Sequence, residues 1–449
     1  MVSRAFHLND ASSFVKKALR WASQFDSVCY LDSNGYRDNY GKIDVFIAVG
    51  EQEAFITEEP KHDYDTVDKR ENDAGERDRS TFDRLQEFID QHPGHWIPGF
   101  LGYDLKNELE HLSTREPNRT GMPDAYFFIP KYTLLIGRYN VEIKAVDPQT
   151  VISEIEQTAG ETLPVDFDGQ LHHRMSRDAY LEAFGHIQRH LHQGDCYEIN
   201  LCQEFYAEHA TINPLGLYQH LNEHSPTPFS CFFKFRDKYI LSASPERFIS
   251  KQDRILLSQP IKGTAPRGKD PIEDERLKQE LLSNEKEISE NVMIVDLVRN
   301  DLTRSARPGT VRTTELAKAY SFKQVHQLIS TISCEIDSEV PITSAIAHAF
   351  PPGSMTGAPK VKAMELIDRY ENSRRGVYAG ALGYFGPQGN FDFSVVIRTL
   401  IYNARAGYLS FHTGGAITTK SEPEMEYAEC LLKGQALFEI LAGKSARNT

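Results

Sequence analysis

The stretch 229–260, "FSCFFKFRDKYILSASPERFISKQDRILLSQP", constrains the fold more than any other part of the chain. Apolar and polar residues alternate along it in short runs, a pattern that is typical of a set of antiparallel strands. Elsewhere too, strands cluster and helices cluster, without a regular strand–helix–strand repeat. The sequence therefore predicts an α+β fold that is built on antiparallel sheets.

The chain has 449 residues, which is enough for one large domain or two ordinary ones. Residues 1–165 form an N-terminal region and residues 172–445 a second region, and the two are expected to share one body. The polar stretch near 147–170 is the expected boundary. Residues 51–80 are charged and poor in apolar side chains, so they are expected to form a mobile surface excursion.

Several elements can be placed from their pattern. An amphipathic helix is followed by the strands "SVCYLDS" and "IDVFIAVG", and residues 125–146 read as two strands. In the second region the first helix has Ser176 as its N-cap and Gly194 as its C-cap. Residues 274–302 and 423–443 are also expected to be helical.

The composition excludes some classes of function. The chain carries 64 acidic and 50 basic side chains and a net charge of −14, which argues against a nucleic-acid or anionic-membrane surface. No apolar run approaches the roughly 18–20 residues of a membrane span. The N-terminus lacks the apolar core of a signal peptide, and the six cysteines form no C-x-x-C pair. We therefore expect a cytoplasmic protein with free thiols.

Two pairs of carboxylates stand out on expected helices. Glu287 and Glu290 form one pair, and Glu426 and Glu429 form the other, which is followed by Lys433. Residues three or four apart share a helix face, so two such helices could enclose a hard divalent cation such as Mg²⁺. The alternative is a pair of solvated charged faces, because the E-x-x-E pattern by itself is very common.

A lysine and a glutamate lie near each other in the sequence. Lys262 stands in "LSQPIKGTAPRGKD", and Glu246 stands at the end of the apolar strand in "SASPERF". Lysine beside glycine and proline is usually an ordinary cation in a surface loop. A carboxyl group near apolar walls can have a raised pKa and act as a general acid, although Glu246 could instead pair with Arg247.

Two further patterns favour an anion site. Arg398 lies in "DFSVVIRTLIY", inside an otherwise apolar expected strand, where it either pairs in the core or points at an anion. Gly414 and Gly415 are expected in a loop before the last helix, where bare N–H groups could cradle a carboxylate. The small-residue loop 350–360 lacks the phosphate-binding loop pattern.

Eight motifs together resemble the chorismate-utilising enzymes, and they occur in the order seen in that family. They are "GDCYEINL", "SASPERF", "PIKGTAPR", "ENVMIVDLVRNDL", "FPPGSMTGAPK", "VYAGALGYF", "DFSVVIRT" and "EPEMEYAECLLKGQAL". The resemblance is strong over about 172–445 and weak before it, where only "GFLGYDL" matches. It implies a large chorismate-binding α+β fold with two antiparallel β-sheets flanked by helices, and a cleft in which Mg²⁺ bridges glutamates and the ring carboxylate of chorismate.

The resemblance also implies roles for individual residues. Glu290 and Glu429 would bind the metal directly, with Glu287 and Glu426 in its outer shell. Glu246 would protonate the departing 4-hydroxyl of chorismate. The residues expected to bind the substrate are Lys433, Arg398, Tyr378, Thr264, Thr356 and the amides of Gly414 and Gly415.

Lys262 distinguishes branches of the family. The anthranilate synthases carry alanine here, whereas the aminodeoxychorismate synthases carry lysine. A neutral lysine can attack C2 and expel the 4-hydroxyl, after which ammonia attacks C4 and expels the lysine. The resemblance thus implies formation of 4-amino-4-deoxychorismate, the precursor of 4-aminobenzoate and folate. We expect the pKa of Lys262 to be depressed by desolvation and by nearby positive charge.

The source of nitrogen is indicated by the residue at position 198 and by a motif that the sequence lacks. Isochorismate and salicylate synthases place a lysine base where this chain has Glu198, so activation of water is not expected. Ammonia-using relatives usually have glutamine there, which leaves the contacts of Glu198 open. The chain has no G-x-C-x-G motif of a glutamine amidotransferase, so ammonia is expected from a separate glutaminase subunit or from solution. The alternative functions for the chain are those of anthranilate synthase component I, of isochorismate or salicylate synthase, and of a non-catalytic anion-binding module. Relatives can hold tryptophan in the N-terminal region, and "YLDS" (30–33) is a poor match to the leucine-glutamate-serine pattern of those sites, so tryptophan binding stays open.

Overall fold

The computed structural model describes residues 1–36, 43–57, 79–323 and 325–443. The strands are β1 (Val2–His7), β2 (Ser27–Asp32), β3 (Val45–Ile56), β4 (Ile97–Leu101), β5 (Ala125–Ile136), β6 (Asn140–Ala145), β7 (Phe167–Asp168), β8 (His172–His173), β9 (Glu198–Ala207), β10 (Thr211–Ile212), β11 (Phe229–Phe235), β12 (Lys238–Ser244), β13 (Arg247–Gln252), β14 (Ile255–Gln259), β15 (Ile261–Pro266), β16 (Arg312–Ser321), β17 (Val325–Glu335), β18 (Gly357–Ala358), β19 (Ala381–Phe385), β20 (Phe391–Val395), β21 (Thr399–Asn403) and β22 (Tyr408–Ile417).

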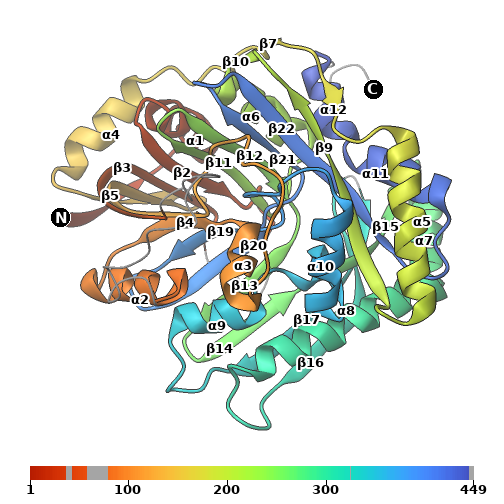
Figure 1. Ribbon diagram of the computed structural model, residues 1–449. Coiled ribbons are helices and arrows are strands. Elements are labelled where there is room, and N and C mark those ends of the chain that lie inside the picture. The colour runs from red at the N-terminus through yellow and green to blue at the C-terminus, as the bar shows by residue number, and fades with distance from the viewer. Residues whose placement is uncertain (37–42, 58–78, 324, 444–449) are drawn as a thin grey trace, which may run out of the picture.

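The helices lie between and around these strands (Figure 1). They are α1 (Ala11–Ala22), α2 (Thr81–Gln91), α3 (Lys106–Glu110), α4 (Pro148–Gln157), α5 (Arg177–Gln193), α6 (Pro214–His224), α7 (Pro271–Ser283), α8 (Glu285–Thr303), α9 (Ile342–Ala349), α10 (Lys360–Tyr370), α11 (Pro423–Lys433) and α12 (Gln435–Leu441), with short 3₁₀ turns at Tyr103–Leu105 and Gly353–Met355.

The strands form one continuous antiparallel network whose two halves, called here the first and the second sheet, join at the long strand β5, and β7 and β10 pair separately. One side of β5 pairs with β3, and the sheet continues through β2, β11, β12, β21, β22 and β9. The other side pairs with β4 and β6. From β4 the second sheet runs through β19, β20, β13, β14 and β17, which β15 and β16 flank. The predicted α+β class with two antiparallel sheets and flanking helices is confirmed.

The chain passes between the two sheets at two neighbouring places. Strand β12 belongs to the first sheet and β13 to the second, so the chain crosses at the Pro245–Glu246 step. Strands β20 and β21 cross in the opposite sense, around Arg398. Backbone bonds tie the crossings together, because Ala243 N–H donates to Arg398 O at 3.1 Å and Val395 N–H donates to Glu246 O at 3.0 Å.

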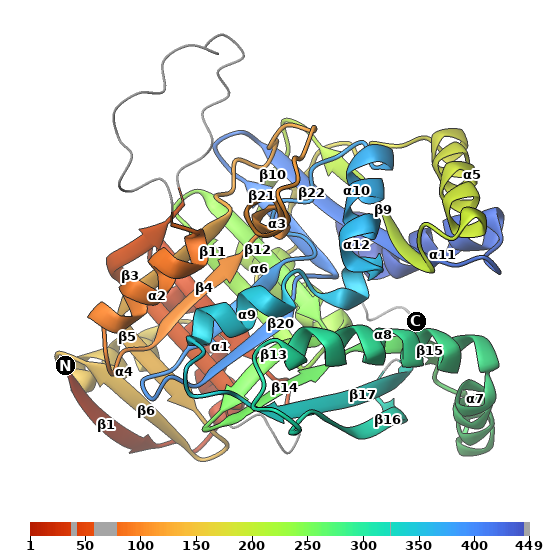
Figure 2. The same ribbon diagram turned by 60° about the horizontal axis from the view of Figure 1, so that its bottom comes forward.

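Helices pack on both sheets. Helix α8 packs on β15, β16 and β17, and α11 packs on β22 and α5 (Figure 2). On the first sheet, α1 and α4 pack together, and α6 lies against β12 and α12. Strands of the N-terminal region pair directly with strands of the second region, as β2 does with β11 and β4 with β19. No helix in the described residues is long and apolar enough to cross a membrane.

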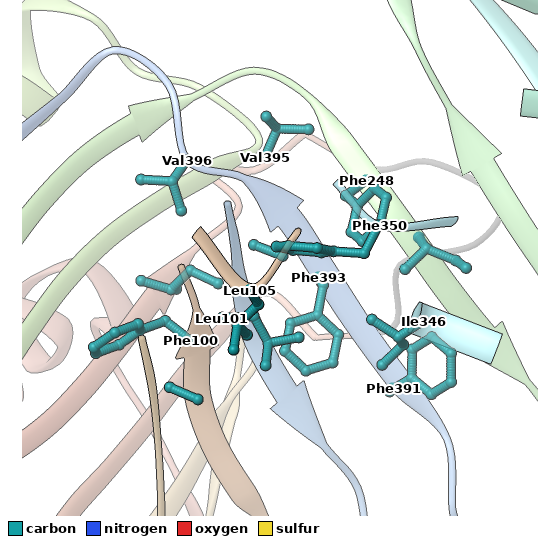
Figure 3. Close-up of a cluster of buried hydrophobic side chains, with 14 of the residues drawn as sticks. Phe100, Leu101, Leu105, Phe248, Ile346, Phe350, Phe391, Phe393, Val395 and Val396 are labelled. Atoms are coloured by element: carbon teal, nitrogen blue, oxygen red, sulfur yellow. The ribbon is translucent and has the colours of Figure 1, made fainter. Parts of the chain in front are cut away.

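An aromatic core fills the space where the two sheets face each other. Phe100 on β4 and Phe393 on β20 contribute fully buried rings (Figure 3). Phe248 and Phe350 meet edge to face, with their ring centroids 6.1 Å apart. Burial of each such side chain stabilises the fold by roughly 1.5–3 kcal/mol. The core includes Val395, the last residue of β20, and so supports the chain where it crosses between the two sheets.

Most element predictions in the second region are confirmed, but the expected surface excursion and the two long helices need correction. Ser176 caps α5 by accepting from Ala179 N–H, and Gly194 ends it with a φ of 82°. The expected surface excursion begins too early, because Glu51–Ile56 extend β3 along β5; residues 58–78 lie outside the described residues. Part of the stretch 147–170, where a boundary is expected, forms the helix α4, which Asp147 caps.

The two long predicted helices are each divided. Asn284 separates α7 from α8 because its side chain accepts the N–H groups of Lys286 and Glu287 and so starts a new helix. Gly434 separates α11 from α12. The break at Asn284 starts α8 anew, so that Glu287 lies in its first turn.

Candidate active site

Glu246 sits buried at the crossing between the sheets. It is 4% exposed, and burial raises the pKa of its carboxyl group to about 7, although Ser354, Lys262 and Arg398 offset part of the shift. The alternative of an ion pair with Arg247 is wrong, because the Arg247 guanidinium donates to Asp392 at 2.9 Å. A carboxyl group that is still partly protonated near neutral pH can serve as a general acid.

Arg398 is placed differently from the prediction. It does not lie within a strand but in the bend between β20 and β21, with a φ of 51° in the left-handed region. This conformation is costly for a residue with a side chain and marks a position that the surrounding structure enforces. Its guanidinium makes no hydrogen bond or ion pair with any of the described residues. Burial lowers the pKa of Arg398, and the negative charge of Glu246 opposes this shift. The geometry suits capture of an anion.

Lys262 is an internal residue of β15 and not a loop cation. Its side chain is 11% exposed, and Nζ donates to Oε1 of Glu198 at 2.6 Å. Desolvation pulls the pKa of Lys262 down, but Glu198, Glu290 and Glu246 outweigh it and hold the pKa above its ordinary value. The expected depression is therefore wrong for the protein without ligands, because carboxylates and not cations surround the amine.

Gly263 and Asn291 fix the backbone beside Lys262. Gly263 has a φ of 97°, and a Cβ there would lie 3.1 Å from Oε2 of Glu287, so only glycine fits this bulge in β15. Asn291 on α8 donates to the carbonyl of Lys262 at 3.2 Å. These contacts bind β15 to α8 and set Lys262 next to the acidic helix.

The predicted carboxylate pairs lie on helices as expected. Glu290 on α8 and Glu426 on α11 are 9% and 2% exposed, and each has one buried oxygen without a hydrogen-bond partner. Burial raises the pKa of Glu290 to about 7, and burial also raises the pKa values of Glu287 and Glu426. Glu429 has a lowered pKa: burial would raise it, but Lys433 at 2.8 Å outweighs this.

Lys286 was not expected at the site. Its Nζ lies 3.9 Å from Glu290 Oε1 and 3.7 Å from Glu426 Oε1, so it bridges the two helices. The only signal in the sequence was its place beside Glu287, which by itself indicates nothing more than a charged helix. Glu198 was singled out, but its ion pair with Lys262 was not foreseen, because the two residues are 64 positions apart in the chain.

The residues fit Mg²⁺ in chemistry more than in arrangement. Carboxylate oxygens are the ligands that Mg²⁺ prefers, and buried oxygens of Glu290 and Glu426 lack partners. However, the described residues form no group of three or more His, Cys, Asp or Glu side chains close enough to hold a metal ion. Binding would require Lys286 to leave its place between the helices. Glu290, Glu426 and their neighbours Glu287 and Glu429 are the residues that would hold the ion.

The two glycines lie in a strand and not in the expected loop. Gly414 and Gly415 are internal to β22, where they face Cys202 and Leu201 of β9. The opposite edge of β22 is paired with β21 only as far as Ser410. A Cβ at Gly415 would lie 3.1 Å from Glu426 Oε2 and 3.8 Å from Lys433 Nζ, so this glycine leaves open the space between the carboxylates and the lysine.

Of three further predicted substrate contacts, two make contacts within the protein and one lies on β15 two positions after Lys262. The hydroxyl of Tyr378 lies 3.4 Å from the thiol of Cys202, and its ring stacks on His412, so this side chain is 3% exposed. Thr356 is fully buried and donates to the carbonyl of Gly353 at 3.2 Å. Thr264 on β15 is exposed. Their roles as substrate ligands stay predictions.

This fold, with a buried acid, a buried lysine and facing carboxylate helices, defines a chorismate-binding enzyme: the chain belongs to that family, which matches residues 26–439. It is 39% identical over 347 residues to aminodeoxychorismate synthase component 1 of Klebsiella aerogenes, covering 76% of each chain. The structure of anthranilate synthase component I from Streptococcus pneumoniae shares 28% identity and a TM-score of 0.68, covering 80% of this chain and 85% of that one. A menaquinone-specific isochorismate synthase from Escherichia coli shares the fold at 16% identity and a TM-score of 0.71, covering 98% of this chain and 95% of that one.

Proposed function

We propose that the chain converts chorismate and ammonia to 4-amino-4-deoxychorismate, as an amino-group transferase of the cytoplasm that supplies 4-aminobenzoate and folate synthesis. The observation that carries this proposal is Lys262, a largely buried amine close enough to the carboxyl group of Glu246 for the charges of the two groups to interact. The relatives named aminodeoxychorismate synthase support the same reaction. Anthranilate formation would need no nucleophilic side chain at this position.

The first step joins Lys262 to the substrate. The neutral amine attacks C2 of chorismate, the two conjugated ring double bonds shift to C1=C6 and C4=C5, and the C4–O bond breaks. Glu246 donates its proton to the departing hydroxyl, which leaves as water. Burial supports this role because a carboxyl group with a pKa of about 7 retains its proton in a large fraction of molecules at neutral pH.

The second step releases the lysine. Ammonia attacks C4, both ring double bonds shift back, and Lys262 departs from C2 as the neutral amine. The new ammonium group at C4 returns a proton to Glu246. The sum is chorismate and ammonia giving 4-amino-4-deoxychorismate and water, divided into two allylic displacements of lower barrier.

Positively charged groups hold the substrate carboxylates in this proposal. Arg398 offers a guanidinium without a protein partner among the described residues, and Lys433 lies beside Gly415 at the open edge of β22. Mg²⁺ held by the glutamates of α8 and α11 would neutralise the ring carboxylate and stabilise negative charge that develops there. Ammonia would come from a separate glutamine amidotransferase subunit.

The test is identification of the product. The purified chain is incubated with chorismate, Mg²⁺ and ammonium salt, and the product is identified by mass spectrometry and by its reaction with a lyase that removes pyruvate. We expect 4-amino-4-deoxychorismate, which gives 4-aminobenzoate. Formation of anthranilate or of isochorismate would overturn the proposal and would place the chain in a different branch of the family.

A further inference from the structure

Lys262 is surrounded by groups that keep it protonated. Glu198 Oε1 lies 2.6 Å from its Nζ, and the two side chains are 1% and 11% exposed. Glu290 and Glu246 add further negative charge. An ammonium group has no lone pair and cannot attack carbon. The proposed reaction therefore needs a neighbouring group that removes the proton from Lys262.

Glu198 is placed firmly enough to do this. It begins β9, where its backbone pairs with Ala358 of β18. Gly357 has a φ of 151°, and a Cβ there would meet Glu198 O at 2.1 Å, so the two backbones are in close contact. The second carboxylate oxygen of Glu198 is buried and has no hydrogen-bond partner. A proton on that oxygen would therefore displace no existing hydrogen bond.

We propose that Glu198 is the proton acceptor for Lys262, taking a proton from Nζ before the C2–N bond forms and returning it after lysine leaves. This inference rests on the proposed function and deepens it. The transfer turns an ammonium–carboxylate pair into an amine–carboxylic acid pair. No proton enters or leaves the cleft in that transfer, and Glu246 remains free to protonate the 4-hydroxyl.

The surroundings of Lys262 and Glu198 favour transfer of the proton between these two side chains over its loss to solvent. The charged groups that influence Lys262 come from each packed element: Glu198 on β9, Glu290 on α8 and Glu246 at the β12–β13 crossing. Lys262 in turn acts on Glu287 of α8 and Glu429 of α11. Burial penalises an ion pair relative to its neutral form. A neutral pair is therefore more accessible here than it would be in water.

The pair has a distinct signature in its dependence on pH. While the pair holds one proton, the fraction of neutral Lys262 depends only on how the two groups share it, so this fraction does not change with pH. Without Glu198, the proton must pass to solvent, and the neutral fraction rises about tenfold per pH unit until the lysine has titrated. A purely structural ion pair would give the second behaviour in the wild type.

The experiment measures the reactivity of Lys262 with acetic anhydride, which modifies only neutral amines. Peptide mass mapping gives the rate for the full chain from about pH 6 to about pH 9, with the exposed Lys420 as internal standard. We expect a constant rate for Lys262 in the wild type and a rise of about tenfold per pH unit in Glu198→Gln. Glu204→Gln is the matched control, since Glu204 is a buried carboxylate of the same strand that binds Arg174 at 2.9 Å.

A rise of about tenfold per unit in the wild type would overturn the proposal, and so would a constant rate in both the wild type and Glu198→Gln. The wild-type profile alone is informative even if the variant does not fold. A mass adduct of chorismate on Lys262 is measured separately. Its absence would count against the proposed function, whereas the acetylation profile tests the proton acceptor without any substrate.

Discussion

Glu290 on α8 and Glu426 on α11 face each other across the ammonium group of Lys286, which lies 3.9 Å from one carboxylate and 3.7 Å from the other. Each glutamate comes from a helix that packs against a different part of the sheet system. The ammonium group thus compensates two buried carboxylates that would otherwise repel each other. A divalent cation would compensate them more strongly and would displace Lys286.

We predict that turnover requires Mg²⁺ and that Glu290→Ala and Glu429→Ala abolish it. The reason is that each variant removes a carboxylate from the set that would hold the ion. Activity is measured in buffer freed of metal with EDTA and then supplied with Mg²⁺, and circular dichroism checks that the fold survives. Near wild-type activity of either variant in metal-free buffer would show that the metal assignment is wrong.

Lys262→Ala is predicted to change the product and not simply to reduce the rate. Without the amine at C2, ammonia can reach that carbon and form 2-amino-2-deoxyisochorismate. Lys262→Arg should be almost inactive, because a guanidinium stays protonated and cannot attack. Intact-protein mass spectrometry during turnover should show a substrate adduct on Lys262 in the wild type. Production of 4-amino-4-deoxychorismate by Lys262→Ala at the wild-type rate, without an adduct in the wild type, would contradict the covalent step.

The acid role of Glu246 predicts a fall in kcat/KM for chorismate above about pH 7, where its carboxyl group loses its proton. Free ammonia must be held at one concentration across the series, since its own ionisation would otherwise dominate the profile. Glu246→Gln should lower kcat by about 10²- to 10⁴-fold. A profile of the wild type that stays level through this range would rule out Glu246 as the acid.

The same shift predicts a dependence of stability on pH. The pKa of Glu246 rises from 4.5 to about 7 on folding, so its contribution is complete below the unfolded value and is lost as pH rises through about 7. The loss amounts to about 3 kcal/mol. Glu246→Gln carries no charge to bury, so it should be more stable than the wild type at about pH 8. Urea unfolding at acidic and alkaline pH measures this difference, and equal stability of the two proteins at alkaline pH would contradict it.

Ammonium salts are predicted to sustain activity at alkaline pH, while glutamine should work only with an added glutaminase subunit. The reason is that the sequence lacks the nucleophile motif of a glutamine amidotransferase. The measurement compares product formation from each nitrogen source by the chain alone and with the added subunit. Robust turnover of glutamine by the chain alone would contradict this prediction.

Adjacent glycines of β22 should behave differently when they are changed to alanine. Gly415→Ala places a methyl group 3.1 Å from Glu426 and 3.8 Å from Lys433, so it should raise the KM for chorismate at least tenfold with little loss of stability. Gly414→Ala places one 2.2 Å from the carbonyl of Leu201 and should destabilise the fold. Gly185→Ala in α5 is the control, since nothing lies within 4 Å of its added carbon. Thermal unfolding and steady-state kinetics separate these effects, and a normal KM for Gly415→Ala would show that the space is not used.

The fold class, the presence of helices that carry the carboxylate pairs and the family all follow from the sequence alone. Alternation in β11 to β14, the caps of α5 and the spacing from Glu426 to Lys433 are local signals, because they depend on residues that are close in the chain. The order of the motifs added the expected chemistry. Local pattern failed where neighbours in space decide the outcome, as at Glu51–Ile56, which β5 draws into a sheet.

Only the tertiary structure decided how the site is assembled. The two crossings between the sheets bring Glu246 and Arg398 together, although the two residues are far apart in the chain and neither segment indicates the other as its neighbour. The ion pair of Lys262 with Glu198 joins β15 to the start of β9, and Lys286 joins α8 to α11. These contacts arise from sheet pairing and helix packing over long distances in the chain. The pKa shifts follow from them, because burial and neighbouring charge, and not residue type alone, set the protonation of a side chain.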